Sequence, residues 1–252
     1  MAEKSALSIR SLSGGYLDNN VLHGISLEIE KGSFTAIAGP NGSGKSTFLK
    51  YLIRELPCPG KTVFLDCNDI NELRQREIAR LISFMGQYVP HREEFTVREA
   101  VALGRFSYGD VQTNTADVDR AMSLAGISEL SDKLVTRISG GEFQLAMLAR
   151  TICQDAPVLA LDEPVNNLDP RHQIMLLDLL SSLSSSGKTI LCVLHDLNAI
   201  VRTCPRCILL KDGRVFAHGE TKSVLTPENI KSVYGIDVTL LSHEGKSVVV
   251  FD

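Results

Sequence analysis

Runs of hydrophobic residues alternate along the chain with stretches in which the hydrophobic positions follow helical spacing. Runs of strand length cover residues 34–38, 158–161 and 189–194, and such runs are typical of strands that are buried on both faces of a sheet. Residues 45–56 and 170–186 instead place apolar side chains along one side of a helix. This alternation predicts an α/β fold in which helices cover a sheet.

Shorter segments complete the pattern. Apolar and polar residues alternate around Leu27 and Ile29, which predicts a half-buried strand. The other predicted elements are strands at 61–66 and 82–87, helices at 71–81 and 197–204, and a hairpin over 206–220 that turns at the sequence Lys-Asp-Gly-Arg.

From about residue 90 to residue 131 the pattern is helical only. Two segments within this stretch, 96–105 and 115–127, each begin with threonine, a residue that often caps the start of a helix. We therefore expect a small helical subdomain at about 90–131, within a single domain that spans residues 1–252.

Composition narrows the class of protein. The chain has 252 residues, of which 44% are hydrophobic and 22% charged, enough for one sizeable α/β domain. The net charge of −4 supplies no broad basic field, so we expect no nucleic-acid partner. The first ten residues are too polar for a signal peptide, and no apolar run approaches the roughly 20 residues that span a bilayer. We expect a chain that is soluble by itself.

Cysteine usage points to a reducing compartment. The six cysteines show no disulfide-like spacing, and without a secretory signal reduced thiols are expected. Cys204 and Cys207 form a C-x-x-C pair, but no second pair accompanies it, and it leads into an apolar run. We interpret these two thiols as packed at a helix–strand junction rather than as metal ligands.

A glycine-rich loop carries the clearest chemistry. The sequence GPNGSGKST fits G-x-x-x-x-G-K-[ST] and falls between a predicted strand and a predicted helix, as that motif requires. Its backbone N–H groups can surround phosphate oxygens, and the helix adds its positive N-terminus. Lys45 would reach the β- and γ-phosphates, and the Ser46 hydroxyl would take a Mg²⁺ position. The predicted nucleotide-binding residues are Gly39, Pro40, Asn41, Gly42, Ser43, Gly44, Lys45, Ser46 and Thr47.

Polar residues at the ends of other predicted strands complete this site. Asp162 and Glu163 are adjacent at the end of a buried strand, so their side chains leave in different directions. One carboxylate can hold Mg²⁺ while the other acts as a base on water; the pair could instead cap the next helix. His195 and Gln87 also stand at strand ends. His195 could donate to the γ-phosphate, and Gln87 could orient water or touch Mg²⁺, although a lone histidine is usually structural.

Together these motifs resemble those of the ATP-binding-cassette (ABC) ATPases, and the likeness covers nearly the whole chain. The resemblance implies a P-loop NTPase core, a mixed sheet with flanking helices, together with an antiparallel β subdomain and a small α-helical subdomain. It implies ATP and Mg²⁺ as ligands. The matching residues are Tyr16 for adenine stacking, 39–47 for Walker A, Gln87 for the Q-loop, 139–144 for the signature, Asp162 for Walker B, Glu163 for the catalytic glutamate, 166–169 for the D-loop and His195 for the switch.

The sequence Ser-Gly-Gly occurs twice, and the resemblance separates the two copies. The second tripeptide, at 139–141, opens the signature helix. By the resemblance, the positive end of this helix would face ATP on the P-loop of another chain of the same protein, giving a head-to-tail homodimer in the ATP-bound state. The first copy, at 13–15, delivers Tyr16 to adenine. The predicted signature contacts are Ser139, Gly140, Gly141 and Glu142. Glu142 replaces the commoner glutamine, and we expect its carboxylate to turn toward the ribose hydroxyls.

Softer signals indicate the type of transporter. Residues 95–105, 169–180, 193–202 and 225–238 resemble importers of iron–siderophore, haem or cobalamin type. That resemblance implies an integral membrane permease, indirectly a solute-binding protein, and a location on the cytoplasmic face of the membrane. Other interpretations stay open: an importer of metals, vitamins or amino acids, a non-transport ABC ATPase, a metabolic P-loop kinase, or pairing with a paralogue instead of a second copy.

Overall fold

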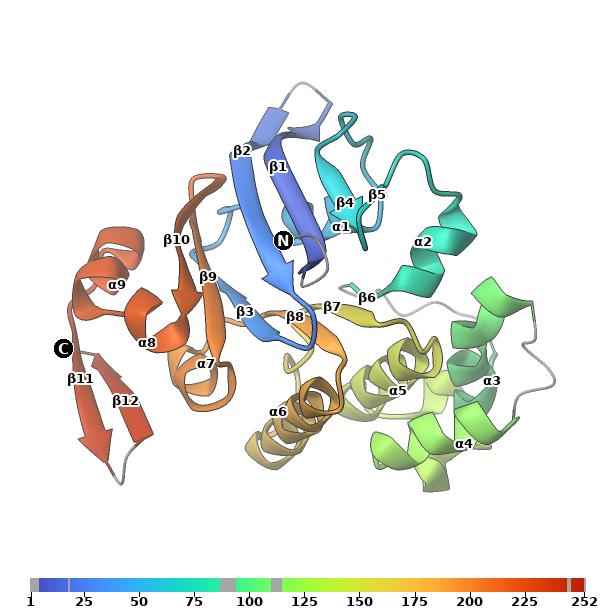
Figure 1. The fold of residues 1–252 in the computed structure, drawn as a ribbon. Helices are drawn as coiled ribbons and strands as arrows, with labels where there is room; N and C mark the ends of the chain where they lie inside the picture. Colours follow the sequence, from blue (N-terminus) through green and yellow to red (C-terminus); the bar gives the residue numbers. More distant parts are fainter. Residues whose placement is uncertain (1–4, 18, 87–93, 110–114, 244–245, 252) are drawn as a thin grey trace.

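A six-stranded sheet forms the centre of the molecule (Figure 1). The computed structural model describes residues 5–17, 19–86, 94–109, 115–243 and 246–251. Five strands of this sheet are parallel and β10 pairs antiparallel with β9. In spatial order they are β10 (Arg214–Glu220), β9 (Arg206–Lys211), β3 (Phe34–Ala38), β8 (Thr189–Val193), β7 (Val158–Asp162) and β6 (Ile82–Met85). The predicted hairpin over 206–220 is thus confirmed.

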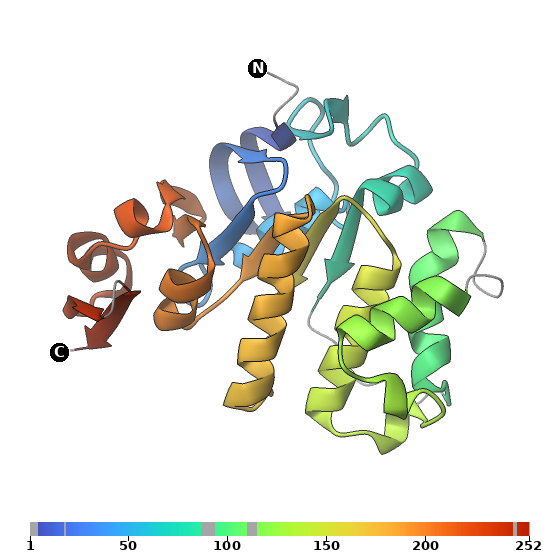
Figure 2. The same cartoon turned by 60° about the horizontal axis from the view of Figure 1, so that its bottom comes forward.

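The continuous apolar runs are explained by two cores, one on each face of this sheet. Successive side chains of a strand point to opposite faces, and in β7 Leu159 and Leu161 belong to one core while Val158 and Ala160 belong to the other. Figure 2 shows the helices that cover the first face. They are α5 (Gly140–Cys153), α6 (Pro170–Ser185) and α7 (Leu197–Thr203).

The second face is covered by helix α1 (Lys45–Leu52) and by an antiparallel sheet. That sheet has the order β2 (Asn19–Glu30), β1 (Ser5–Tyr16), β4 (Val63–Leu65) and β5 (Asn68–Asp69). Gly14 in β1 has φ +153°, and a Cβ there would overlap the Tyr51 hydroxyl of α1. The first Ser-Gly-Gly therefore allows the strand to lie directly against this helix.

Beside the central sheet, short helices pack against α5 in the first core (Figure 2). Thr96 caps α3, since its hydroxyl accepts a hydrogen bond from the Glu99 N–H. The predicted helix at 71–81 begins only at Gln75, and the one predicted at 45–56 ends at Leu52. The helices of this group are α3 (Val97–Ala102), the 3₁₀ helix η2 (Leu103–Tyr108), α4 (Thr115–Leu124), η3 (Ser128–Leu130) and η4 (Val135–Arg137). Helix α2 (Gln75–Leu81) instead buries Ile78 in the second core.

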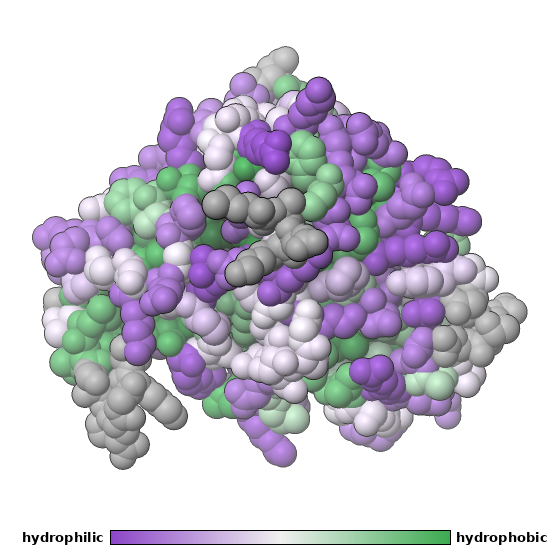
Figure 3. All heavy atoms as spheres, in the orientation of Figure 1, coloured by the Kyte–Doolittle hydropathy of each residue, from purple (hydrophilic) through white to green (hydrophobic). Residues whose placement is uncertain are grey.

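The C-terminal segment is a unit that the hydrophobic pattern did not predict. It comprises α8 (Thr221–Val224), α9 (Pro227–Tyr234) and an antiparallel hairpin of β11 (Val238–His243) and β12 (Lys246–Phe251). On the face drawn in Figure 3, apolar side chains gather over this hairpin. Across the described ranges, none of the helices combines the length and the hydropathy that a bilayer crossing needs.

Candidate active site

The glycine-rich loop connects the buried strand β3 to α1, as predicted. Gly42 and Gly44 adopt φ +79° and +97°, a left-handed region that glycine occupies without a steric penalty. Gly44 is also the N-cap of α1 and supplies no side-chain acceptor. No N-cap side chain therefore occupies the first N–H groups of the helix, and such free N–H groups are what binds anions at a helix start.

Lys45 is folded back onto this loop. Its side chain is buried, and Nζ donates to the carbonyl oxygens of Gly39 at 2.8 Å and Pro40 at 2.9 Å. Burial lowers the pKa of the Lys45 ammonium, while Glu163 and Asp162 act in the opposite direction. The cation is thus held at the loop by neutral acceptors, near two carboxylates.

Asp162 lies at the end of β7, and only 3% of its surface is exposed. Among the described residues, its Oδ1 atom is buried without a hydrogen-bond partner, as is the Ser43 hydroxyl. Burial raises the pKa of the Asp162 carboxyl, and a hydrogen bond with Ser46 partly offsets this. A carboxylate and a hydroxyl are the hard oxygen ligands that Mg²⁺ prefers, so Asp162 and Ser46 fit the predicted metal site.

Glu163 makes several polar contacts at this edge of the sheet. Its Oε1 lies 2.6 Å from the His195 Nε2, and its Oε2 accepts a hydrogen bond from the Asn166 amide. Gln144 of α5 donates to the carbonyls of Glu163 at 3.3 Å and Pro164 at 3.2 Å. The backbone of Glu163 has φ +56°, which is uncommon for a residue other than glycine and is found more often at functional sites.

The topology explains why these residues meet. Strands β3, β8 and β7 are parallel neighbours, so the residues that follow them come together at one edge of the sheet. Lys45 follows β3, Asp162 and Glu163 stand at the end of β7, and His195 follows β8. The carboxyl ends of parallel strands are where α/β folds bind ligands.

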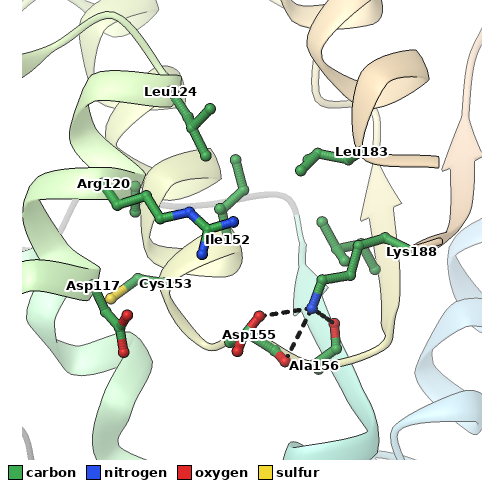
Figure 4. Close-up of a pocket in the computed structure, with 11 residues that line it drawn as sticks. Asp117, Arg120, Leu124, Ile152, Cys153, Asp155, Ala156, Leu183 and Lys188 are labelled. Atoms are coloured by element: carbon green, nitrogen blue, oxygen red, sulfur yellow. Dashed lines mark hydrogen bonds and ion pairs between the residues drawn. The ribbon is translucent and has the colours of Figure 1, made fainter. Parts of the chain in front are cut away.

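Figure 4 shows a pocket at the opposite edge of the sheet. Asp155 and Ala156 precede β7 and Lys188 precedes β8, so this pocket lies at the amino ends of the strands. The Lys188 Nζ donates to the Asp155 carboxylate at 2.7 Å and to the Ala156 carbonyl at 3.0 Å. The pocket is therefore separate from the site that the motifs predict.

The signature segment opens α5 with a reciprocal cap. The Ser139 hydroxyl accepts from the Glu142 N–H at 3.3 Å, and the Glu142 carboxylate accepts from the Ser139 N–H at 2.7 Å. The hydrogen bond from the Ser139 backbone lowers the pKa of Glu142. The pattern S-x-x-E is a capping-box signal that our sequence interpretation did not use. Among the described residues, no hydrogen bond or ion pair joins 139–142 to the loop 39–47.

Two further predicted residues lie apart from this cluster. Tyr16 is 43% exposed, and the Lys50 Nζ of α1 is 5.7 Å from its ring centroid, so the ring stands beside the helix that follows the loop. Gln87 lies outside the described residues, and its predicted role stays a prediction.

The two thiols of the C-x-x-C pair are free and buried at the junction of α7 and β9. Burial raises the pKa of Cys207 to about 12. The interpretation of Cys204 and Cys207 as packed structural thiols is confirmed.

Comparison with known proteins places this chain in a family. The sequence profile of the ABC transporter family matches residues 22–166, and the chain belongs to this family. It is 38% identical to the ferric enterobactin transport ATP-binding protein FepC of Escherichia coli, over 89% of this chain and 85% of that protein. It is also 38% identical to the hemin import ATP-binding protein HmuV of Rhizobium meliloti, over 93% and 91%.

Other matches agree on the fold. The chain is 35% identical to the uncharacterized ABC transporter ATP-binding protein YvrA of Bacillus subtilis, over 94% of this chain. It spans 55% of the length of that protein. An ATP-binding cassette of an ABC transporter, solved in its ADP conformation, superposes with a TM-score of 0.80. That match covers 91% of this chain and 98% of the other at 23% identity. The predicted fold class is confirmed.

Proposed function

We propose that this chain is the ATP-hydrolysing subunit of an ABC importer that takes up an iron chelate, either a siderophore or haem, or cobalamin. The observation that carries the ATPase assignment is Glu163, held between His195 and Asn166 beside Lys45 and Asp162. The import assignment is supported by the names of relatives that act on ferric enterobactin and hemin. A different cargo stays open, because none of the residues in this cluster is one that cargo would contact.

The loop and Lys45 bind the triphosphate. Lys45 Nζ exchanges the carbonyls of Gly39 and Pro40 for phosphate oxygens, which are stronger partners because the hydrogen bonds are charge-assisted. Tyr16 stacks on adenine. Ser46, Asp162 and Gln87 would hold Mg²⁺, which would supply positive charge beside the phosphates.

Glu163 is the general base. It accepts a proton from the water that attacks the γ-phosphorus, while the bond from that phosphorus to the bridging β-phosphate oxygen breaks and ADP leaves. This role needs a carboxylate held in one orientation. His195 contacts one of its oxygens and Asn166 the other. His195 is 40% exposed at its side chain, so it can also turn to donate a hydrogen bond to the γ-phosphate.

The active assembly is a homodimer in which residues 139–142 of one copy meet ATP on the loop 39–47 of the other. Support for this comes from the exposed start of α5, where Ser139 and Gly140 face solvent, together with the absence of a contact to the loop within the described residues. The pair works on an integral membrane permease at the cytoplasmic face of the membrane, and a solute-binding protein supplies the cargo.

The test is ATP hydrolysis by the purified chain with MgATP, compared with Glu163→Gln. We expect Glu163→Gln to lose activity by about 10²–10⁴-fold, the range that a general base contributes, and to form a dimer in MgATP by analytical ultracentrifugation. Glu129→Gln, which changes an exposed glutamate far from the cluster in sequence, should behave as the unmodified chain. A Glu163→Gln chain that stays monomeric at saturating MgATP would contradict the dimer or the role of Glu163.

A further inference from the structure

Asn198 joins the C-terminal hairpin to the helix that follows His195. Its side-chain amide donates to the Val249 carbonyl at 3.0 Å, and its side-chain oxygen accepts from the Val249 N–H at 2.7 Å. One side chain thus satisfies both backbone groups of a residue in β12. Because both groups of Val249 point away from β11, the amide takes the place of a neighbouring strand at this edge.

The position of α7 depends on such contacts. The helix has only seven residues, Leu197–Thr203, which is too short to be stable by itself in water. Its N-cap is Asp196, whose side chain accepts from the Asn198 N–H at 2.8 Å. Asn198 is therefore bonded on one side to the residue next to His195 and on the other side to β12.

The hairpin that Asn198 holds is itself anchored in the molecule. The Val249 side chain is 2% exposed and belongs to the core that also contains Leu197 and Ile200 of α7. A displacement of β12 would therefore move the first turn of α7. His195 would move with it, and the 2.6 Å contact between His195 and Glu163 would lengthen.

We propose that Asn198 is a positioning residue for ATP hydrolysis: its paired hydrogen bonds to Val249 use the C-terminal hairpin to fix His195 against Glu163. Asn198 acts through His195 and does not touch the substrate. This inference rests on the proposed function, because it assumes that the contact between His195 and Glu163 serves hydrolysis.

The experiment compares Asn198→Ala with Asn229→Ala. Asn229 lies in the same C-terminal segment and its side chain also donates to one backbone carbonyl, that of Val224, at 2.8 Å, but it makes no hydrogen bond to α7 or β12 among the described contacts. We expect Asn198→Ala to lower kcat about tenfold with KM for ATP nearly unchanged, since a displacement of about 1 Å can cost about 100-fold. Asn229→Ala should lose similar thermal stability and keep its kcat.

A second variant tests the same bond from the other side. Val249→Pro removes the backbone N–H that donates to the side-chain oxygen of Asn198. The position lies at a strand edge, where proline is tolerated. The kcat of the double variant Asn198→Ala/Val249→Pro should be no lower than that of the slower single variant, because both changes break the same pairing between Asn198 and Val249. Additive losses of kcat would overturn the proposal.

A measurement that does not need turnover separates this inference from the proposed function. The ring resonances of His195, assigned with His195→Ala, should shift in the NMR spectrum of Asn198→Ala and stay in place in Asn229→Ala. Unshifted His195 resonances, or a kcat in Asn198→Ala equal to that of Asn229→Ala, would overturn the positioning role. If the unmodified chain does not hydrolyse ATP, the proposed function fails, and the His195 resonances still decide whether Asn198 positions the ring.

Discussion

Two lysines at opposite edges of the central sheet make nearly the same hydrogen bonds. The Lys45 Nζ donates to two backbone carbonyls at the carboxyl ends of the strands. The Lys188 Nζ also donates to two backbone carbonyls, at the amino ends, and adds the Asp155 carboxylate at 2.7 Å (Figure 4). Among the described contacts, the difference is that Lys188 has a bonded anion and Lys45 does not.

The same contrast extends to the acids. Asp155 is paired at the amino edge. Asp162 at the carboxyl edge keeps Oδ1 buried with no partner in the described part of the chain, and burial raises the pKa of its carboxyl. A buried polar atom without a partner costs free energy, and such costs concentrate at functional sites. At the amino edge the lysine and the aspartate are hydrogen-bonded to each other. At the carboxyl edge similar residues keep hydrogen-bonding capacity that a ligand can use.

The largest expected difference between the two edges comes from removing each lysine in turn. Lys45→Ala should lower ATPase activity by about 10²–10³-fold, the loss typical when one donor to developing charge is removed. Lys188→Ala should leave the activity unchanged and destabilise the fold by about 0.2–1 kcal/mol, because its ion pair is partly exposed. Steady-state ATPase assays and urea unfolding measure both. Equal losses of activity in the two variants would remove the distinction between the edges.

Asp162→Asn should separate function from stability. An acid whose pKa is raised in the folded state destabilises the fold once the pH exceeds its ordinary value of 3.8. Without nucleotide, the variant should therefore melt roughly a few degrees higher than the unmodified chain near neutral pH, and this difference should shrink as the pH falls toward that value. ATPase activity should be lost. A lower melting temperature at neutral pH would show that the Asp162 carboxylate is stabilised in the free protein.

The smallest effect is expected at Glu142, which is a satisfied acid. Its carboxylate caps α5 through the Ser139 N–H, and glutamine can accept the same hydrogen bond. Glu142→Gln should therefore keep the ATPase activity or raise it modestly. Because the pKa of Glu142 is lowered, its carboxylate stabilises the fold at pH values above the ordinary glutamate pKa, and this stability is lost as the pH falls through the lowered pKa. In Glu142→Gln only this dependence of stability on acidic pH should disappear. A collapse of activity would give Glu142 a catalytic role.

Much of the fold could be predicted because the signals are local. The runs at 34–38 and 158–161 indicated strands buried on both faces, and the glycine-rich loop stood between a strand and a helix as expected. Boundaries were less accurate: the helix predicted from residue 71 begins at Gln75. The hairpin of β11 and β12 was not predicted, since its strands follow a helical segment and, among the described strands, pair only with each other.

The candidate site was predicted as a set of residues but not as a set of contacts. Asn166 and Gln144 bond to Glu163 from separate elements. Asn198 bonds to Asp196, the neighbour of His195, and to Val249. Of these, Asn166 and Gln144 stood inside matched motifs without an assigned contact, and Asn198 gave no signal of its own. An amide side chain forms bonds with whatever backbone the fold brings near, and sequence spacing does not reveal that backbone.

The sequence by itself determined the loop 39–47, the buried strand that ends in Asp162 and Glu163, and the alternation of strands and helices, because each follows from residue types within one segment. Only the tertiary structure decided that His195 lies 2.6 Å from Glu163. It also decided that the C-terminal hairpin is hydrogen-bonded to α7, the helix that follows His195. Those contacts depend on the order of strands in the sheet, which is set by packing between segments far apart in the chain.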